Sequence, residues 1–203
     1  MKKTTVKIED ARNLLKDYLL RLAPDTNLNE LEELIVQFTE DKFSKKEMLL
    51  EAGNHSDTVY FVYEGLVRIY YIKEEKEITN WFIKENMMFA ATYSILTGEK
   101  NYSNYETLED TFVLKIKYSV LESFYNKYHS LEHLGRKIIE TYYGAFMKKT
   151  FDVLFLSADE RYNLFIKDQY DLLNRVPLRY IASFLGVTQE TLSRLRTKQH
   201  IQK

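Results

Sequence analysis

The chain of 203 residues contains no cysteine. This absence excludes disulfide bonds, thiolate zinc sites, cysteine-ligated iron–sulfur clusters and cysteine nucleophiles together. No segment approaches the ~18 apolar residues of a membrane span. The first residues, MKKTTVKIEDARNLL, carry acids where a signal peptide needs an apolar run. We therefore expect a soluble, cytoplasmic protein without a membrane segment.

Charge is distributed unevenly along the chain. Apolar residues make up 45% of it and charged residues 29%, which suits one large domain or two modest ones. The net charge is −1, but residues 175–203 hold six basic residues and one acid, a net charge of +5 that leaves −6 for the first 174. A basic module on an acidic body is typical of a protein that touches nucleic acid at one end.

The first two thirds of the chain predict helices followed by antiparallel β structure. Residues 8–22 form an amphipathic pattern that ends before Pro24, and a second short helix is predicted over 28–36. From 38 to 116, short runs rich in Tyr, Phe, Val and Ile alternate with turn signals, which favours a β-sandwich or jelly roll.

Within this β region, turns and one irregular stretch can be located. Gly53 and Gly65 bracket the VYFVY strand, where the chain must reverse, and the charged segment 73–77 predicts the solvated tip of the next hairpin. The middle of the stretch 85–116 is less regular. It is either the place of a ligand loop or a plain connector.

After Tyr118 the pattern returns to helix, with a short helix over 120–125 and a long one over 131–156. Apolar residues near one face of the long helix are Leu131, Leu134, Ile138, Tyr142, Ala145 and Phe146. Such a helix spans roughly 38 Å and suits a dimer seam, although Lys149 interrupts the stripe. Ser157 and Glu160 then match a capping box, which predicts a boundary and a new helix carrying Tyr162 and Phe165.

The stretch RVPLRYIASFLGVTQETLSRLRTK, residues 175–198, predicts a helix-turn-helix. Gly186 supplies the tight turn after Leu185, and Thr188 is a natural N-cap for the second helix. Leu192 and Leu195 recur at helical spacing and face inward. The alternative is an ordinary pair of packed helices.

Together these segments resemble the Crp/Fnr family of bacterial transcription regulators, in the version found in Bacteroidetes. The resemblance is carried by EAGNHSDTVYFVYEGLVRIYY, SADERY and VPLRYIASFLGVTQETLSRLR. It implies an α+β fold: a cyclic-nucleotide-binding-like β-roll with N-terminal helices over residues 1–130, a dimerisation helix over 131–156 and a helix-turn-helix domain over 157–203.

The family's DNA contacts can be carried over to this sequence. The resemblance implies that Gln189, Glu190 and Arg194 contact bases, in keeping with the hydrogen-bonding chemistry of these side chains. The residues expected to contact the DNA backbone are Thr188, Ser193, Arg196 and Lys198. In the family a β wing often follows this helix, whereas about five residues follow Lys198 here, so wing contacts are not expected.

The family's effector site fits less well. In members that bind cyclic AMP a glutamate holds the ribose and an arginine neutralises the phosphate; here Ala91 falls at the first position and Asn101 or Tyr102 at the second. A buried phosphodiester needs a cation, so we expect that cyclic AMP does not bind in the usual way. Lys100 or Arg68 would be substitute charges for another anion.

The sequence thus predicts a homodimeric, sequence-specific regulator that binds double-stranded DNA at a pseudo-palindromic operator, with RNA polymerase as a possible partner. The alternative is a ligand- or protein-binding β-roll module that does not bind DNA. A cupin-like enzyme would need clustered histidines, whereas His55 stands alone in the β region. His129 and His133 share a helical face but lack a third ligand nearby. We expect no catalytic site, metal or cofactor.

Overall fold

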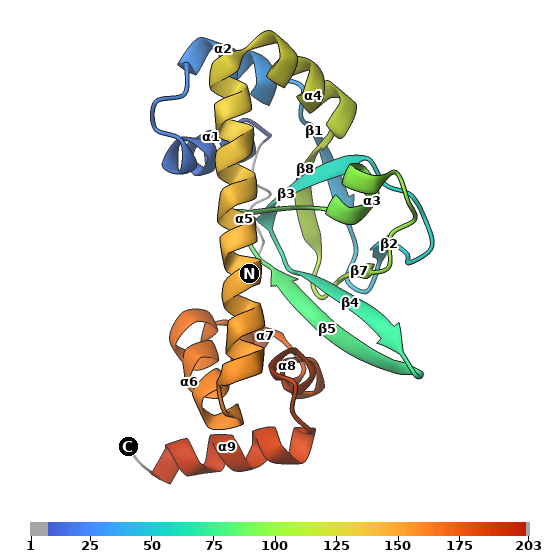
Figure 1. The fold of residues 1–203 in the computed structure, drawn as a ribbon, viewed down its shortest axis with the longest axis vertical. Coiled ribbons are helices and arrows are strands. Elements are labelled where there is room, and N and C mark those ends of the chain that lie inside the picture. Colours follow the sequence, from blue (N-terminus) through green and yellow to red (C-terminus); the bar gives the residue numbers. More distant parts are fainter. Residues whose placement is uncertain (1–7, 202–203) are drawn as a thin grey trace. The chain divides into compact units, whose positions relative to one another are not determined.

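The computed structural model describes residues 8–201 (Figure 1). These fall into two compact units. The first runs up to Ile69 and includes Phe82–Thr141, and the second combines Tyr70–Trp81 with the chain from Tyr142 onward. The predicted α+β class is confirmed. Within the described residues, no helix is both long and apolar enough to cross a membrane.

The β region forms two four-stranded sheets, as the sequence predicts for a jelly roll (Figure 1). One sheet has the order β1-β8-β3-β6 and the other β2-β7-β4-β5. The strands are β1 (Thr39–Phe43), β2 (Met48–Leu50), β3 (Thr58–Glu64), β4 (Val67–Lys73), β5 (Lys76–Ile83), β6 (Met87–Ala90), β7 (Asn104–Thr107) and β8 (Thr111–Lys117). In the first sheet β8 pairs antiparallel with both β1 and β3. Phe61 of β3 lies opposite Leu114 of β8 in this register, and both residues are buried.

Of the two N-terminal helices, α1 packs on this first sheet and α2 packs against α1. The helix α1 (Ile8–Leu22) has the predicted bounds, and its buried residues Ala11, Leu15 and Leu19 recur every fourth position. Tyr18 of α1 contacts Phe61 of β3, with ring centroids 5.6 Å apart. The helix α2 (Leu28–Ile35) is capped by the side chain of Asn27 and ends one residue earlier than predicted.

Gly65 makes the reversal between β3 and β4 possible. Its φ is +108°, a conformation that favours glycine, and a Cβ there would lie 2.5 Å from Oγ1 of Thr111 and 2.7 Å from the carbonyl oxygen of Asp110. Gly53 also has a positive φ, +88°. Both glycines therefore lie at chain reversals, as predicted.

The irregular stretch after β6 contains a short helix, α3 (Thr92–Thr97), which the sequence did not predict. Gly98 ends it in the left-handed conformation with φ +73°, and its N–H donates to the carbonyl of Ser94. The helix is short and only its Ser94 is buried, so the sequence has no apolar periodicity that predicts it.

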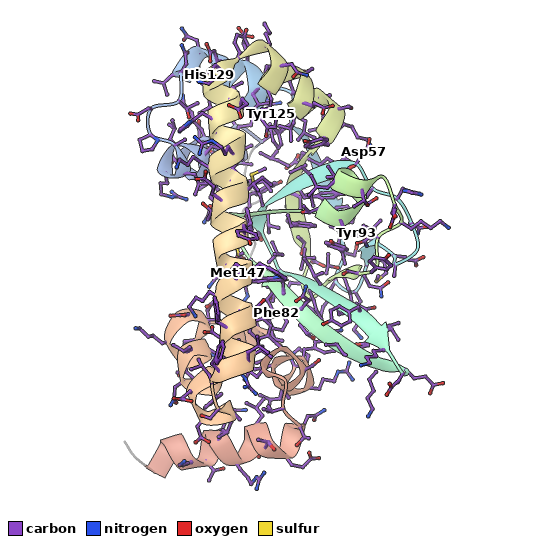
Figure 2. The ribbon with its side chains drawn as sticks, in the orientation of Figure 1. Asp57, Phe82, Tyr93, Tyr125, His129 and Met147 are labelled. Atoms are coloured by element: carbon purple, nitrogen blue, oxygen red, sulfur yellow. The ribbon has the colours of Figure 1, made fainter. Side chains whose placement is uncertain are left out.

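The helix α5 (His129–Phe155) is long, as predicted, and follows α4 (Tyr118–Lys127). Leu131 and Leu134 near its start are buried, and Gly135 lies against the ring of Tyr125, where a Cβ would come within 2.8 Å of the ring (Figure 2). Further along, apolar residues are exposed. They are Ile139, Tyr143, Phe146, Phe151, Val153, Leu154 and Phe155.

The second unit contains α6 (Ala158–Gln169), α7 (Leu172–Arg175), α8 (Leu178–Leu185) and α9 (Gln189–Ile201). The predicted capping box is confirmed: the Ser157 hydroxyl accepts from the N–H of Glu160, whose carboxylate accepts from the N–H of Ser157. Tyr162 and Phe165 of α6 are buried, and the ring of Phe165 lies 5.8 Å from that of Phe184 in α8.

The tip of the β4–β5 hairpin belongs to this second unit. It is exposed, as predicted, and two residues, Glu74 and Glu75, connect the strands with φ of +50° and +62°. Positive φ at both central residues is the mark of a type I′ turn, whose twist suits a two-residue hairpin.

Candidate nucleic-acid interface

The turn between α8 and α9 has the geometry of a helix-turn-helix. Gly186 adopts φ +67°, its N–H donates to the carbonyl of Ser183, and the N–H of Val187 donates to the carbonyl of Ala182. Arg161 of α6 donates from Nε to the carbonyl of Leu185 at 2.9 Å. The end of α8 is therefore fixed by its own turn and by a third helix.

The second helix of the motif begins as predicted. The hydroxyl of Thr188 accepts from the N–H of Thr191 at 3.2 Å, which satisfies one of the free donors of the first turn. Leu192 and Leu195 are buried beneath the helix. These contacts leave the opposite face of α9 open.

The exposed face of α9 brings the three predicted base-contact residues together. Gln189, Glu190 and Arg194 line one open groove of about 820 Å³. The other residues along this groove are Leu178, Ser193, Thr197 and Lys198. A row of amide, carboxylate, hydroxyl and guanidinium groups on one helix face has the donor and acceptor chemistry that reads base edges in a major groove.

Neighbouring hydroxyls hold two of these side chains. The hydroxyl of Thr188 lowers the pKa of the Glu190 carboxyl by hydrogen bonding, so this side chain is an anionic acceptor. The guanidinium of Arg194 donates to the hydroxyl of Thr191 at 3.2 Å, and that hydroxyl lies 3.2 Å from the one of Thr188. Sequence reasoning missed Thr191, although it precedes Arg194 by one helical turn.

The predicted backbone-contact residues surround this face in different ways. Ser193 lies in the groove itself, and the hydroxyl of Thr188 is used in the cap. Lys198 forms a 2.8 Å ion pair with Asp159 at the start of α6, and Arg196 is half-buried. By helical spacing, Arg196 and Lys198 lie on opposite flanks of the open face.

The five predicted effector residues differ in burial and in their partners. Ala91 is buried directly before α3, and Asn101 is buried in a loop where its side-chain amide donates to the carbonyl of Ser103. Tyr102 is 65% exposed and its ring is tilted against that of Tyr93, with ring centroids 4.8 Å apart.

The two candidate substitute cations differ in burial. Arg68 is fully buried and its guanidinium lies 3.6 Å from the carboxylate of Glu106, so its charge faces an acid. Lys100 is exposed. Whether the residues at the family's ribose and phosphate positions accept a cyclic nucleotide therefore stays a prediction from their chemistry.

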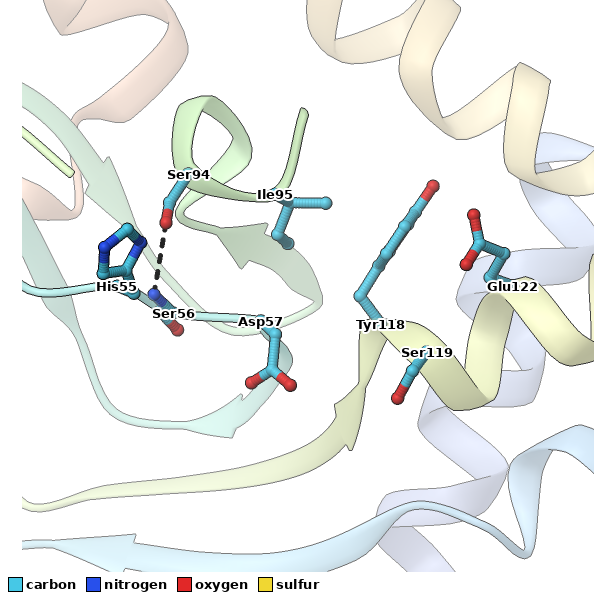
Figure 3. A pocket seen from close by; sticks show the side chains of 8 residues that line it. All are labelled: His55, Ser56, Asp57, Ser94, Ile95, Tyr118, Ser119 and Glu122. Carbon is cyan, nitrogen blue, oxygen red and sulfur yellow. Dashed lines mark hydrogen bonds between the residues drawn. The ribbon is translucent and has the colours of Figure 1, made fainter. Parts of the chain in front are cut away.

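A small pocket of about 320 Å³ opens elsewhere in the first unit (Figure 3). It is lined by His55, Ser56, Asp57, Ser94, Ile95, Tyr118, Ser119 and Glu122. The N–H of Ser56 donates to the hydroxyl of Ser94 at 3.3 Å, and Asp57 pairs with Lys117 at 2.5 Å. None of the predicted effector residues contributes to it.

Histidines do not gather into a metal site in the described part of the chain. His129 is 3.9 Å from the carboxylate of Glu132 and almost fully exposed, while His133 contacts the guanidinium of Arg136 at 2.9 Å. Within residues 8–201 no group of three His, Asp or Glu side chains could hold a metal ion.

Comparisons with known proteins agree with this architecture. A model described as "cyclic nucleotide-binding domain" matches residues 40–128. The fumarate and nitrate reduction regulatory protein of Vibrio cholerae is 24% identical over 190 residues, covering 84% of this chain and 72% of that protein. The anaerobic regulatory protein of Haemophilus influenzae is 22% identical over 187 residues, covering 84% and 70%.

Solved structures share the fold over most of the chain. FixK2 from Bradyrhizobium japonicum has a TM-score of 0.69 at 23% identity, covering 81% of this chain and 85% of that one. A transcriptional regulator of the Crp/Fnr family from Eubacterium rectale has a TM-score of 0.68 at 16% identity, covering 91% and 88%. The chain therefore resembles regulators of the Crp/Fnr family in its cyclic nucleotide-binding domain, in sequence over most of its length, and in fold.

Proposed function

We propose that this protein is a sequence-specific DNA-binding transcription regulator whose α9 enters the major groove. The observation that carries the proposal is the open groove that places Gln189, Glu190 and Arg194 side by side behind a glycine turn. Glutamine can bond bidentately to adenine, glutamate accepts from the cytosine amino group, and arginine bonds bidentately to guanine. Each good pair contributes about 1–3 kcal/mol of discrimination between bases.

The protein acts as a homodimer through α5 in this proposal. Ile139, Tyr143, Phe146 and Val153 are each at least half exposed and recur at alternating spacings of four, three and seven residues. This is the periodicity of a coiled-coil seam, with Thr150 completing it. The stripe is shifted by one residue from the one that Ile138 and Tyr142 suggest in the sequence, so Lys149 does not interrupt it.

Two-fold symmetry sets the form of the DNA site. A symmetric dimer carries two copies of α9 and therefore reads a pseudo-palindrome whose half-sites are one helical turn apart, about 34–36 Å. RNA polymerase is a partner of the dimer in this proposal, because a regulator bound at an operator acts on transcription by recruiting or blocking the polymerase. Because the DNA of a bacterial cell lies in the cytoplasm, we expect the protein there.

The effector in this proposal is not cyclic AMP bound in the family's usual way. Ala91 cannot replace a glutamate at the ribose, and Tyr102 points toward Tyr93 instead of supplying a cation for a phosphate. Isothermal titration with cyclic AMP should show no binding in the micromolar range. A micromolar dissociation constant would overturn this part of the proposal.

Enrichment of bound sequences from a random duplex pool tests the proposed function. The parent protein should select a pseudo-palindrome, whereas Arg194→Ala should bind the same pool without preference at one position in each half-site. Equal recovery of all sequences by the parent would contradict sequence-specific reading. Failure of the parent to bind any duplex would favour a ligand- or protein-binding β-roll module instead.

A further inference from the structure

The β4–β5 hairpin is joined to the first helix of the DNA-reading motif by one side chain. The hydroxyl of Ser183 in α8 accepts from the N–H of Thr79 at 2.9 Å and donates to the carbonyl of Glu77 at 3.0 Å. Both hydrogen-bonding functions of the hydroxyl are therefore used on the backbone of β5. Residues 70–81 and α8 belong to the same compact unit.

A half-buried lysine from α5 contacts the same strand and helix. The ammonium of Lys149 donates to the backbone carbonyl and, at 3.1 Å, to the side-chain oxygen of Asn80 in β5. It also lies 4.4 Å from the ring centroid of Phe184 and 5.1 Å from that of Trp81. Three elements, α5, β5 and α8, thus meet around the side chain of Lys149, whose ammonium faces both oxygens and aromatic rings.

These contacts differ from the packing that holds the motif together. Ala182 and Leu185 of α8 are buried against other helices, where apolar side chains of suitable volume would serve. The contact made by Ser183 is directional instead, because its two hydrogen bonds fix α8 to the N–H of Thr79 and the carbonyl of Glu77 on the strand. A shift of β5 by one residue would break both bonds.

We propose that the β4–β5 hairpin is a positioning element for DNA reading and that Ser183 is its positioning residue on the helix-turn-helix. The hairpin sets the orientation of α8, and Gly186 with its fixed turn passes this orientation to α9. The strands β4 and β5 are neighbours in the sheet of order β2-β7-β4-β5, so the hairpin is continuous with the β-roll. The proposal rests on the proposed function, because DNA is its readout.

The test compares Ser183→Ala with Ser183→Thr in the full-length protein. The alanine variant lacks both hydrogen bonds and should bind the selected duplex about tenfold more weakly, since each bond contributes modestly. The slope of log K against log salt should stay unchanged because the phosphate contacts remain. The threonine variant keeps the hydroxyl and should recover most of the affinity.

Hydrogen exchange at the Thr79 amide provides the second readout. This amide should be protected in the parent and in Ser183→Thr, and should exchange faster in Ser183→Ala with an unchanged melting temperature. Faster exchange with parental DNA affinity would overturn the positioning role, and an unprotected amide in the parent would overturn the contact itself. If the parent selects no duplex, the proposed function fails, while the exchange data still decide whether the hairpin contact exists.

Discussion

The guanidinium of Arg194 donates a hydrogen bond to the hydroxyl of Thr191, one helical turn earlier on the same face. Thr191 therefore fixes the direction of an exposed arginine before DNA is present, which lowers the entropy cost of forming a bidentate contact. The Thr188 hydroxyl, 3.2 Å from that of Thr191, extends the chain of contacts to the start of α9.

Replacing Thr191 by valine keeps the side-chain shape and removes the acceptor. We expect discrimination at the base position read by Arg194 to fall by a few-fold, less than the roughly tenfold loss in Arg194→Ala. Competition binding with duplexes altered at that position measures the ratio. Thr141→Val is the matched control, because the Thr141 hydroxyl donates to the carbonyl of Lys137 in its own helix α5 and Thr141 does not line the α9 groove. Equal effects of both valine variants would contradict a special role for Thr191.

Asp159 should restrain Lys198 from phosphate binding, because the two form an exposed 2.8 Å ion pair. Lys198→Ala should weaken all duplexes alike and reduce the salt slope by about 0.9. Asp159→Asn should tighten binding about twofold to fivefold, as expected from an exposed pair of this kind. Asp152→Asn removes an acid from the comparable Lys148 pair and serves as the control. If Asp159→Asn and Asp152→Asn both bound DNA more tightly, the cause would be the change in net charge and not the release of Lys198.

Stability should rise with pH between about 8 and 10 because of Lys149. Burial lowers the pKa of its ammonium from 10.5 to about 8. Between these values the unfolded chain binds the proton and the folded protein does not, so raising the pH increases the free energy of unfolding. The full difference corresponds to about 3 kcal/mol.

Chemical denaturation at pH 7.5 and pH 9.5 measures this change, and Lys149→Met should remove it. The rise in stability with pH should end near pH 10. Burial raises the pKa of Tyr105 and of Tyr125 to about 12, so above pH 10 these tyrosines ionise in the unfolded chain but not in the folded protein, which favours unfolding. An identical pH response in the methionine variant would rule out Lys149 as the cause.

Substituting Gly65 by alanine should destabilise the first unit by about 3 kcal/mol or more. The new Cβ would approach Thr111 to 2.5 Å at a positive φ, so the turn would have to open. Gly144→Ala is the control within a helix. Its Cβ would meet nothing within 4 Å, and the substitution should stabilise by up to about 1 kcal/mol. Urea unfolding of both variants measures the difference, and similar values would contradict the close approach at Gly65.

Tyr143→Glu should separate the proposed dimer, because it places a carboxylate at the centre of the α5 stripe, close to its symmetry mate. Sedimentation equilibrium should show a dissociation constant at least tenfold higher than that of the parent. Phe151→Glu is the matched control, since Phe151 is 52% exposed but lies outside the stripe by helical spacing. A monomeric control variant, or a dimeric Tyr143→Glu, would refute the assignment of the seam.

Local sequence signals predicted much of this fold. Helical periodicity gave α1 its bounds, and Ser157 with Glu160 located the start of α6, because both signals depend only on neighbouring residues. The turn at Gly186 was equally local. The helix α3 escaped because it is too short for a period to show.

Contacts between distant segments could not be read from the sequence. Lys149 interrupts an apolar stripe when helix spacing alone is considered, and its partner Asn80 is 69 residues away. Nothing in the sequence around Ser183 marks its contact with β5, because the hydroxyl donates to the carbonyl of Glu77, more than a hundred residues earlier. Of the DNA-reading face, the sequence supplied the side chains but not the hydrogen bond that aligns Arg194, since rotamers depend on the folded surroundings.

The hydroxyl of Ser183 has a second consequence for β5. In the described sheet order this strand is the outermost one, and outermost strands invite pairing with other chains. A serine that bonds the carbonyl of Glu77 and the N–H of Thr79 occupies groups that a foreign strand would use. Release of α8 from the hairpin would therefore also expose unpaired backbone groups at a sheet edge, which is the kind of edge that favours aggregation.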